Sequence, residues 1–217
     1  CVAGRDGGAA ASGDPSPVTA RGVYLGMREA AKRVFGSDDM TGRTIAVQGV
    51  GHVGGRVCQM LAEAGAKLVI ADVDQEALAE ISRTTGAKVV EPGDIYDVQA
   101  DIFSPNALGA IVNPETVDRL KVKLIAGGAN NQLSSPDMGE TLNQRGILYV
   151  PDYVINGGGI INVAAEISGN YDPAWVETKV QGLVATIGEV LDQAESEGRP
   201  PNRVADEIAA RRLRESA

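Results

Sequence analysis

Apolar positions along this chain of 217 residues follow two alternating patterns. Short runs of apolar, often β-branched residues predict buried strands, and apolar residues spaced three or four apart predict amphipathic helices between them. The predicted strands are at residues 44–47, 67–71, 88–90, 101–103, 122–126 and 147–150. The predicted helices are at 16–35, 53–64, 75–85, 114–120, 135–145 and from 160 onward.

Alternating strands and helices are typical of an α/β domain with a doubly wound sheet. We therefore predict a Rossmann-like sheet of about six strands with helices on both faces. An apolar stripe from Val176 to Ala194 predicts a long helix that packs on this domain or a neighbour, and Asn202 is expected to cap a final helix. The predicted divisions are a loop at 1–15, the Rossmann-like domain at 16–170 and C-terminal helices at 171–217.

A glycine-rich turn follows the first predicted strand, with Gly49, Gly51 and Gly54 in the spacing G-x-G-x-x-G. In a strand–turn–helix unit, the first glycine permits the tight turn, the second lets the backbone approach a pyrophosphate, and the third lets the helix pack close to the strand. The helix that starts at His52 and Val53 would point its N–H groups at that pyrophosphate. The alternative is an ordinary βα turn without a ligand.

Asp72 ends the second strand, where a Rossmann unit places an acid for the adenosine ribose hydroxyls. Because this carboxylate would repel the additional 2′-phosphate of NADP, we expect the cofactor to be NAD. Asp74 is the rival for the role, but its place before the next helix predicts an N-cap. Val73, between the two acids, is a further candidate cofactor contact.

Polar loops also follow the later strands, at residues 104–109, 127–132 and 151–159. Ligands of doubly wound sheets bind at the carboxyl ends of the strands, so these loops are expected to share an edge with the glycine turn. Ala107, Asn130 and Asn156 are the candidates there, and Thr19 adds a hydroxyl that its helix does not need. The alternative for the asparagines is a turn-forming role, and for Thr19 a bond to the turn beneath it.

Composition argues against several classes of protein. A net charge of −9 without a basic block argues against nucleic acid as a partner. The apolar runs are far shorter than the ~20 residues that span a bilayer. Cys1 and Cys58 form no disulfide framework, which fits a reduced, cytoplasmic setting with Cys58 as a buried thiol. His52 is the only histidine and lies in the glycine loop, so neither a histidine base nor a metal site is expected.

Motifs spread over nearly the whole chain resemble the cofactor-binding half of the glutamate/leucine/phenylalanine/valine dehydrogenases, especially the leucine and valine branch. The matching stretches are SGDPSPVTARGV (12–23), AVQGVG (46–51), DIY (94–96), DIF (101–103), ALG (107–109), NQL (131–133) and PDYVIN (151–156). The resemblance implies two domains with a cleft between them, and a mostly parallel sheet with one strand reversed. It also implies reversible oxidative deamination of an L-amino acid to a 2-oxo acid and ammonia, with hydride transfer to NAD.

The resemblance also implies roles for single residues. Thr19 would hold the nicotinamide carboxamide, and Asn130 would lie beside the nicotinamide ribose. Asn156 would contact the α-carboxylate or amino group of the substrate, while Ile160 and Val163 would line its side-chain pocket. Branched apolar residues in that pocket favour an aliphatic, branched-chain amino acid over an aromatic one.

Some parts of the family pattern are not expected in these 217 residues. The family's N-terminal domain carries its catalytic lysines and a linker aspartate, so the acid and base are unassigned and the chain alone is expected to be inactive. Asn106 stands where the branched-chain enzymes have cysteine, and Gly157 replaces the alanine beside Asn156. The full-length enzyme is expected to be a homo-oligomer that assembles largely through the N-terminal domain.

Two other interpretations are open at this point. The chain could be a non-catalytic module that senses NAD or binds a partner. Alternatively, the same class of enzyme could act on phenylalanine or glutamate, because the residues at 160 and 163 describe one wall of the pocket.

Overall fold

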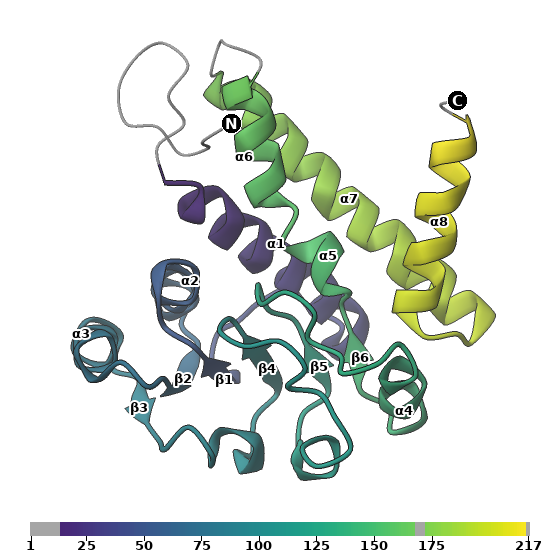
Figure 1. The fold of residues 1–217 in the computed structure, drawn as a ribbon. Helices are drawn as coiled ribbons and strands as arrows, with labels where there is room; N and C mark the ends of the chain where they lie inside the picture. Colours follow the sequence, from purple (N-terminus) through teal and green to yellow (C-terminus); the bar gives the residue numbers. More distant parts are fainter. Residues whose placement is uncertain (1–13, 168–171, 216–217) are drawn as a thin grey trace.

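The computed structural model describes residues 14–167 and 172–215 (Figure 1). The sheet consists of β1 (Thr44–Gln48), β2 (Lys67–Ala71), β3 (Lys88–Val89), β4 (Ile102–Pro105), β5 (Leu124–Ile125) and β6 (Leu148–Tyr149). Its spatial order is β3-β2-β1-β4-β5-β6, and each neighbouring pair is parallel. The predicted Rossmann-like sheet is confirmed. The prediction of one reversed strand is wrong for the described residues. Each connection crosses a face of the sheet, so every strand starts from the same edge and runs in the same direction.

Helices and short turns cover both faces of this sheet. The helices are α1 (Ser16–Phe35), α2 (His52–Glu63), α3 (Gln75–Thr85), α4 (Met138–Gln144), α5 (Asp152–Ile155), α6 (Gly158–Ile167), α7 (Pro173–Glu197) and α8 (Pro201–Glu215). Two 3₁₀ turns, η1 (Ile95–Asp97) and η2 (Val117–Arg119), lie in the connections before β4 and β5. Helix α4 and the turn η2 are therefore shorter than the helices predicted at 135–145 and 114–120.

Alternate residues of the strands enter two separate apolar cores. On β1, Ile45 and Val47 belong to the core beneath α1, α2 and α3, whereas Ala46 belongs to the core beneath η1, η2 and α4. Strands that are buried on both faces need the nearly continuous apolar runs from which they were predicted. Cys58 lies in the first core, and its burial raises the pKa of the thiol to about 12, so the thiol stays protonated.

The C-terminal helices form a layer over α1. Figure 1 shows α7 as a long helix above the sheet, with α8 folded back beside its end. Helix α7 packs along α1 and also contacts α5 and α6, while α8 contacts α4 and α7. A two-pronged ion pair between Arg21 of α1 and Glu177 of α7 joins these helices at the surface, with N–O distances of 2.8 and 2.7 Å.

Two local expectations about this C-terminal part are wrong. Residues 151–159, expected to be a loop, contain α5 and the start of α6. Asn202 is not a cap, because α8 begins at Pro201 and the Asn202 side chain instead donates to the carbonyl of Pro136, 3.1 Å away. Both differences arise from contacts between segments that are distant in the chain.

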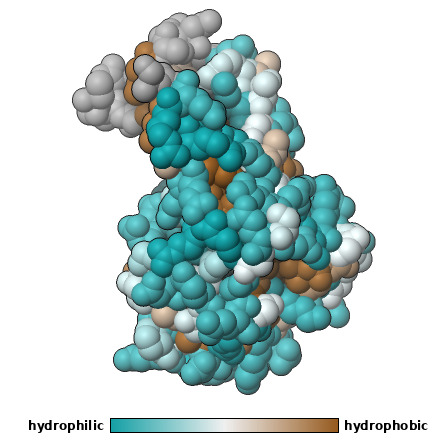
Figure 2. Space-filling view, turned by 90° about the vertical axis from the view of Figure 1, so that its right-hand side faces the viewer, coloured by the Kyte–Doolittle hydropathy of each residue, from teal (hydrophilic) through white to brown (hydrophobic). Residues whose placement is uncertain are grey.

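Figure 2, viewed from the α8 side, shows a mostly hydrophilic surface with apolar colour where the molecule narrows.

Candidate functional site

The glycine turn between β1 and α2 is shaped by close backbone contacts. Gly49 has a φ of +88°, and a Cβ atom on it would lie 2.8 Å from the amide nitrogen of Ala107. A Cβ on Gly54 would overlap the carbonyl oxygen of Gly49, so only glycine lets α2 approach the turn. A Cβ on Gly51, by contrast, would meet no atom within 4 Å. The space beside Gly51 is therefore open, as a pyrophosphate site between turn and helix requires.

The N-terminus of α2 opens toward this space. Gly51 is the N-cap and provides no side chain to bond the first turn, whose N–H groups have no acceptor within the helix. Gly51 and His52 are exposed, and Val53 is half-buried. An open hollow between α2 and α3 lies alongside, lined in part by His52, Arg56 and Asp74. Exposed N–H groups and the positive end of a helix suit an anionic ligand.

The Asp72 carboxylate is fixed by the backbone on both sides. Its Oδ2 accepts from the Val50 N–H at 2.7 Å, and its Oδ1 accepts from the Asp74 N–H at 3.0 Å. Each oxygen keeps a free lone pair, so a pair of ribose hydroxyls fits the remaining capacity. Asp74 caps α3 by accepting from the N–H groups of Glu76 and Ala77, which confirms its predicted role as an N-cap.

Val73 lies beside these acids with 84% of its surface exposed. Ala107, also exposed, lies against Gly49 at the end of β4. Both candidates are thus on the surface at the carboxyl edge of the sheet, and neither is needed by the apolar cores. Their exposure is compatible with contact to a cofactor.

Asn106 ties two strand ends together, a role that the sequence did not reveal. Its Nδ2 donates to the carbonyl and hydroxyl oxygens of Ser104, both at 3.0 Å, and its Oδ1 accepts from the Gly128 N–H at 2.9 Å. The loops after β4 and β5 are held together by this amide. An asparagine amide thus supplies hydrogen bonds that a thiol, which the family resemblance predicts at this position, cannot supply in the same number.

The structure brings Asn130 and Asn156 together from two segments. The Asn156 Nδ2 donates to the Asn130 Oδ1 at 2.6 Å. Asn130 follows β5, and Asn156 is the C-cap of α5. The Asn130 amide nitrogen and the Asn156 oxygen each keep hydrogen-bonding capacity for a ligand.

Thr19 lies where α1 meets α6. Its hydroxyl donates to the carbonyl of Pro15 at 3.1 Å, which is the bond to the preceding turn that the alternative interpretation predicts. The hydroxyl oxygen can still accept a hydrogen bond. A Cβ on Gly159 would lie 3.0 Å from the Thr19 hydroxyl, so the glycines of α6 allow the two helix starts to meet. At Gly157, a Cβ would lie 3.1 Å from both Leu183 Cδ1 and the Val154 carbonyl oxygen, which leaves little room for an alanine.

The predicted substrate-pocket residues stand on α6. Ile160 is 74% exposed and Val163 is half-buried. Ile160 therefore presents an apolar surface to the outside. Burial of such a side chain by a ligand or a further domain would be favourable.

The described segments, 14–167 and 172–215, contain no helix with the length and apolar character that crossing a bilayer requires. Within the same segments, no three His, Cys, Asp or Glu side chains are grouped in a way that could hold a metal ion.

Taken together, the parallel sheet, the glycine turn and the fixed acid define a Rossmann-type α/β domain. The chain belongs to the glutamate/leucine/phenylalanine/valine dehydrogenase family, whose model matches residues 11–78 and 70–215.

Individual relatives share this similarity over most of the chain. The leucine dehydrogenase of Thermoactinomyces intermedius is 49% identical over 93% of this chain and 55% of its own length. The L-tryptophan dehydrogenase of Nostoc punctiforme is 42% identical over 94% of this chain and 58% of the relative. A crystal structure of L-tryptophan dehydrogenase from that organism matches with a TM-score of 0.90 at 40% identity, over 94% of this chain and 60% of the other. The chain thus spans little more than half the length of these relatives.

Proposed function

We propose that this chain is the NAD-binding half of an enzyme that oxidatively deaminates a branched-chain L-amino acid, with leucine as the first candidate. The observation that carries the proposal is the open space at Gly51 between the start of α2 and the fixed Asp72 carboxylate. Leucine dehydrogenases at 46–49% identity support the choice of substrate. The cofactor is NAD, because the Asp72 carboxylate would repel a 2′-phosphate.

The residues of this chain would bind and orient the reactants. The N–H groups at His52 and Val53 bind the pyrophosphate, while Asp72 accepts from the adenosine ribose, next to Val73. At the other end, Ala107 lies along the cofactor. When bound, NAD supplies the hydride acceptor of the reaction.

The substrate end is assigned on the same proposal. Thr19 accepts from the nicotinamide carboxamide, and Asn130 bonds the nicotinamide ribose. Asn156 contacts the α-carboxylate or amino group of the amino acid, with Ile160 and Val163 against its side chain. These roles are supported by the meeting of Asn130 with Asn156 and by the free capacity on all three polar groups.

The larger organisation is also part of the proposal. Residues 16–170 form the NAD-binding domain, residues 1–15 lead into it, and residues 171–217 pack on it or on a second domain that carries the catalytic acid and base. The complete enzyme is a cytoplasmic homo-oligomer. The exposed apolar surface of Ile160 supports a covering partner at this edge.

Binding and turnover of the chain test the two halves of this proposal separately. We expect calorimetric titration to show NADH binding and much weaker NADPH binding. With leucine and NAD, the chain alone is expected to give no turnover. Preference for NADPH would contradict the cofactor assignment, and deamination of leucine by these residues alone would contradict the need for a second domain.

A chimeric enzyme tests the substrate. We expect fusion of this chain to the N-terminal half of the T. intermedius leucine dehydrogenase to oxidise leucine and valine faster than phenylalanine and tryptophan. The intact T. intermedius enzyme is the matched control. A folded chimera that binds NADH but turns over none of these amino acids would favour the non-catalytic NAD-sensing module.

A further inference from the structure

Asp152 is a buried acid outside the proposed ligand contacts. It is 7% exposed. Its Oδ1 accepts from the hydroxyl of Tyr149 at 2.6 Å, and its Oδ2 accepts from the backbone N–H of Asn131 at 2.6 Å. Burial and the adjacent carboxylate raise the pKa of Tyr149, so the phenol stays protonated and acts as a donor.

The same residue holds both segments that carry the asparagine pair. Asn131, which directly follows Asn130, has a φ of +53° and is fixed on its other side by the bond from the Ala110 N–H to its carbonyl, 2.6 Å long. The backbone carbonyl of Asp152 accepts from the Asn156 N–H at 3.0 Å. Asp152 is therefore connected to the residue beside Asn130 and to Asn156 itself.

We propose that Asp152 is a positioning residue: its carboxylate holds the loop 127–132 against α5 and so sets the geometry of the Asn130–Asn156 pair. The inference rests on the proposed function, in which this pair contacts the nicotinamide ribose and the substrate. Asp152 touches neither reactant. Its loss is therefore expected to weaken recognition of the nicotinamide end without changing the adenosine end at Asp72.

The two bonds at Asp152 explain why a carboxylate is required there. Both partners donate to Asp152, and its side chain offers an acceptor oxygen to each of them. An asparagine has the same shape but carries an NH₂ group in place of one oxygen. With the remaining oxygen on the Asn131 N–H, the Tyr149 hydroxyl would lose the acceptor for its buried proton. Loss of a partner for a buried polar group is costly, and the loop or α5 would have to shift to relieve it.

The test compares two ligands on the full chain by isothermal titration calorimetry. ADP contains the adenosine and the pyrophosphate but neither the nicotinamide ribose nor the nicotinamide, whereas NADH contains all of the cofactor. We expect Asp152→Asn to lower NADH affinity about tenfold and to change ADP affinity less than about twofold. A generally damaged fold would weaken both ligands together.

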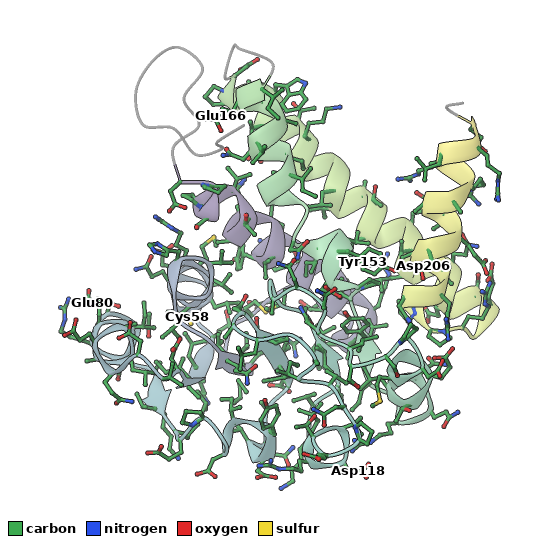
Figure 3. All side chains as sticks on the ribbon, viewed as in Figure 1. Cys58, Glu80, Asp118, Tyr153, Glu166 and Asp206 are labelled. Atoms are coloured by element: carbon green, nitrogen blue, oxygen red, sulfur yellow. The ribbon has the colours of Figure 1, made fainter. Side chains whose placement is uncertain are left out.

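Tyr153→Phe is the matched control on the same short helix. Figure 3 shows Tyr153 on α5 near Asp206 of α8, and its hydroxyl donates to Asp206 Oδ1 at 2.6 Å and to the Asn202 carbonyl at 3.0 Å. This substitution removes a contact of α5 with α8 and leaves the Asp152 carboxylate intact. We expect both ligand affinities to stay unchanged.

A second variant keeps the inference testable if Asp152→Asn does not fold. Tyr149→Phe removes the donor to Oδ1 and leaves the Asn131 bond, so a smaller but equally selective loss of NADH affinity is expected. An unchanged ratio of NADH to ADP affinity in the folded variants overturns the inference alone. Failure of the unaltered chain to bind either ligand overturns the proposed function and the inference together.

Discussion

The two ends of the proposed cofactor site are built in different ways. The adenosine end comes from one continuous segment, from Gly49 to Asp72, and its key contacts are backbone N–H groups and glycine packing. The nicotinamide end draws Thr19, Asn130 and Asn156 from three separate segments, and a side-chain bond joins Asn156 to Asn130. The first end is thus formed by local sequence, whereas the second depends on the whole fold.

This difference also divides the tasks of the site. Glycine packing and backbone donors recognise groups that every dinucleotide carries, so the adenosine end supplies affinity that is independent of the reaction. In the proposed function, a substrate and a second domain complete the nicotinamide end at the exposed Ile160. We therefore expect different substitutions to change the stability of the fold, the affinity for NADH, or the preference for NADH over NADPH.

Gly54→Ala is expected to have the largest effect, because it breaks the adenosine end and the fold together. The new methyl group would overlap the Gly49 carbonyl oxygen and approach the Asn106 Cβ at 3.1 Å. We expect a loss of about 3 kcal/mol in the free energy of unfolding, measured in urea, with loss of NADH binding. Unfolding at the original urea concentration would contradict the assigned packing.

Gly51→Ala is expected to lower the NADH affinity of the adenosine end without lowering the stability of the fold. No atom of the chain lies within 4 Å of the added Cβ, so the urea midpoint is expected to stay within the usual small range of surface substitutions. The methyl group would enter the pyrophosphate space, and NADH affinity is expected to fall about thirtyfold, or about 2 kcal/mol. Unchanged NADH affinity would place the pyrophosphate elsewhere.

Asp72→Ser acts on selectivity at the adenosine end. A serine hydroxyl can replace only part of the two backbone bonds and carries no charge, so NADH affinity is expected to fall about tenfold. The preference for NADH over NADPH, measured by titration with both, is expected to narrow. Asp74→Ser retains an N-capping residue and serves as the control, with both affinities unchanged. Equal preference ratios in the two variants would contradict the ribose assignment.

The smallest expected effect concerns the Arg21–Glu177 ion pair between α1 and α7, near Thr19. The hydrogen bonds of Arg21 hold the pKa of Glu177 at about 2, below its ordinary value of 4.5. A depressed pKa stabilises the fold above pH ~4.5, and this stabilisation is lost as the pH falls toward 2. Because the pair is exposed, Glu177→Gln is expected to cost less than about 1 kcal/mol at pH 7. A stability difference from the unaltered chain that persists at pH 2 would contradict this origin.

The sheet and the glycine turn with its following acid could be predicted because their signals are short in sequence. Strands that are buried on both faces are apolar without interruption, and the turn and acid follow one another within one βαβ unit. The Asp74 cap was likewise predicted from its place before α3, and the contacts to Glu76 and Ala77 confirm it.

The remaining features depend on contacts that no local pattern contains. The local sequence predicts that Asn202 is an N-cap, yet its side chain donates a hydrogen bond to the distant carbonyl of Pro136. Asn106 looked like a simple departure from cysteine, but it joins two strand ends through Ser104 and Gly128. Residues 151–159 have the glycine-rich composition of a loop, and the helical form of α5 depends on packing against α1 and α7.

The open space beside Gly51 has a consequence for how such a domain changes over generations. A side chain at that position would contact neither core of the protein. Selection for a folded, protease-resistant chain therefore does not preserve the glycine. On the proposed function, selection for dinucleotide binding is what preserves it. A duplicated copy released from catalysis could therefore lose its cofactor through a single methyl group and persist as an intact scaffold.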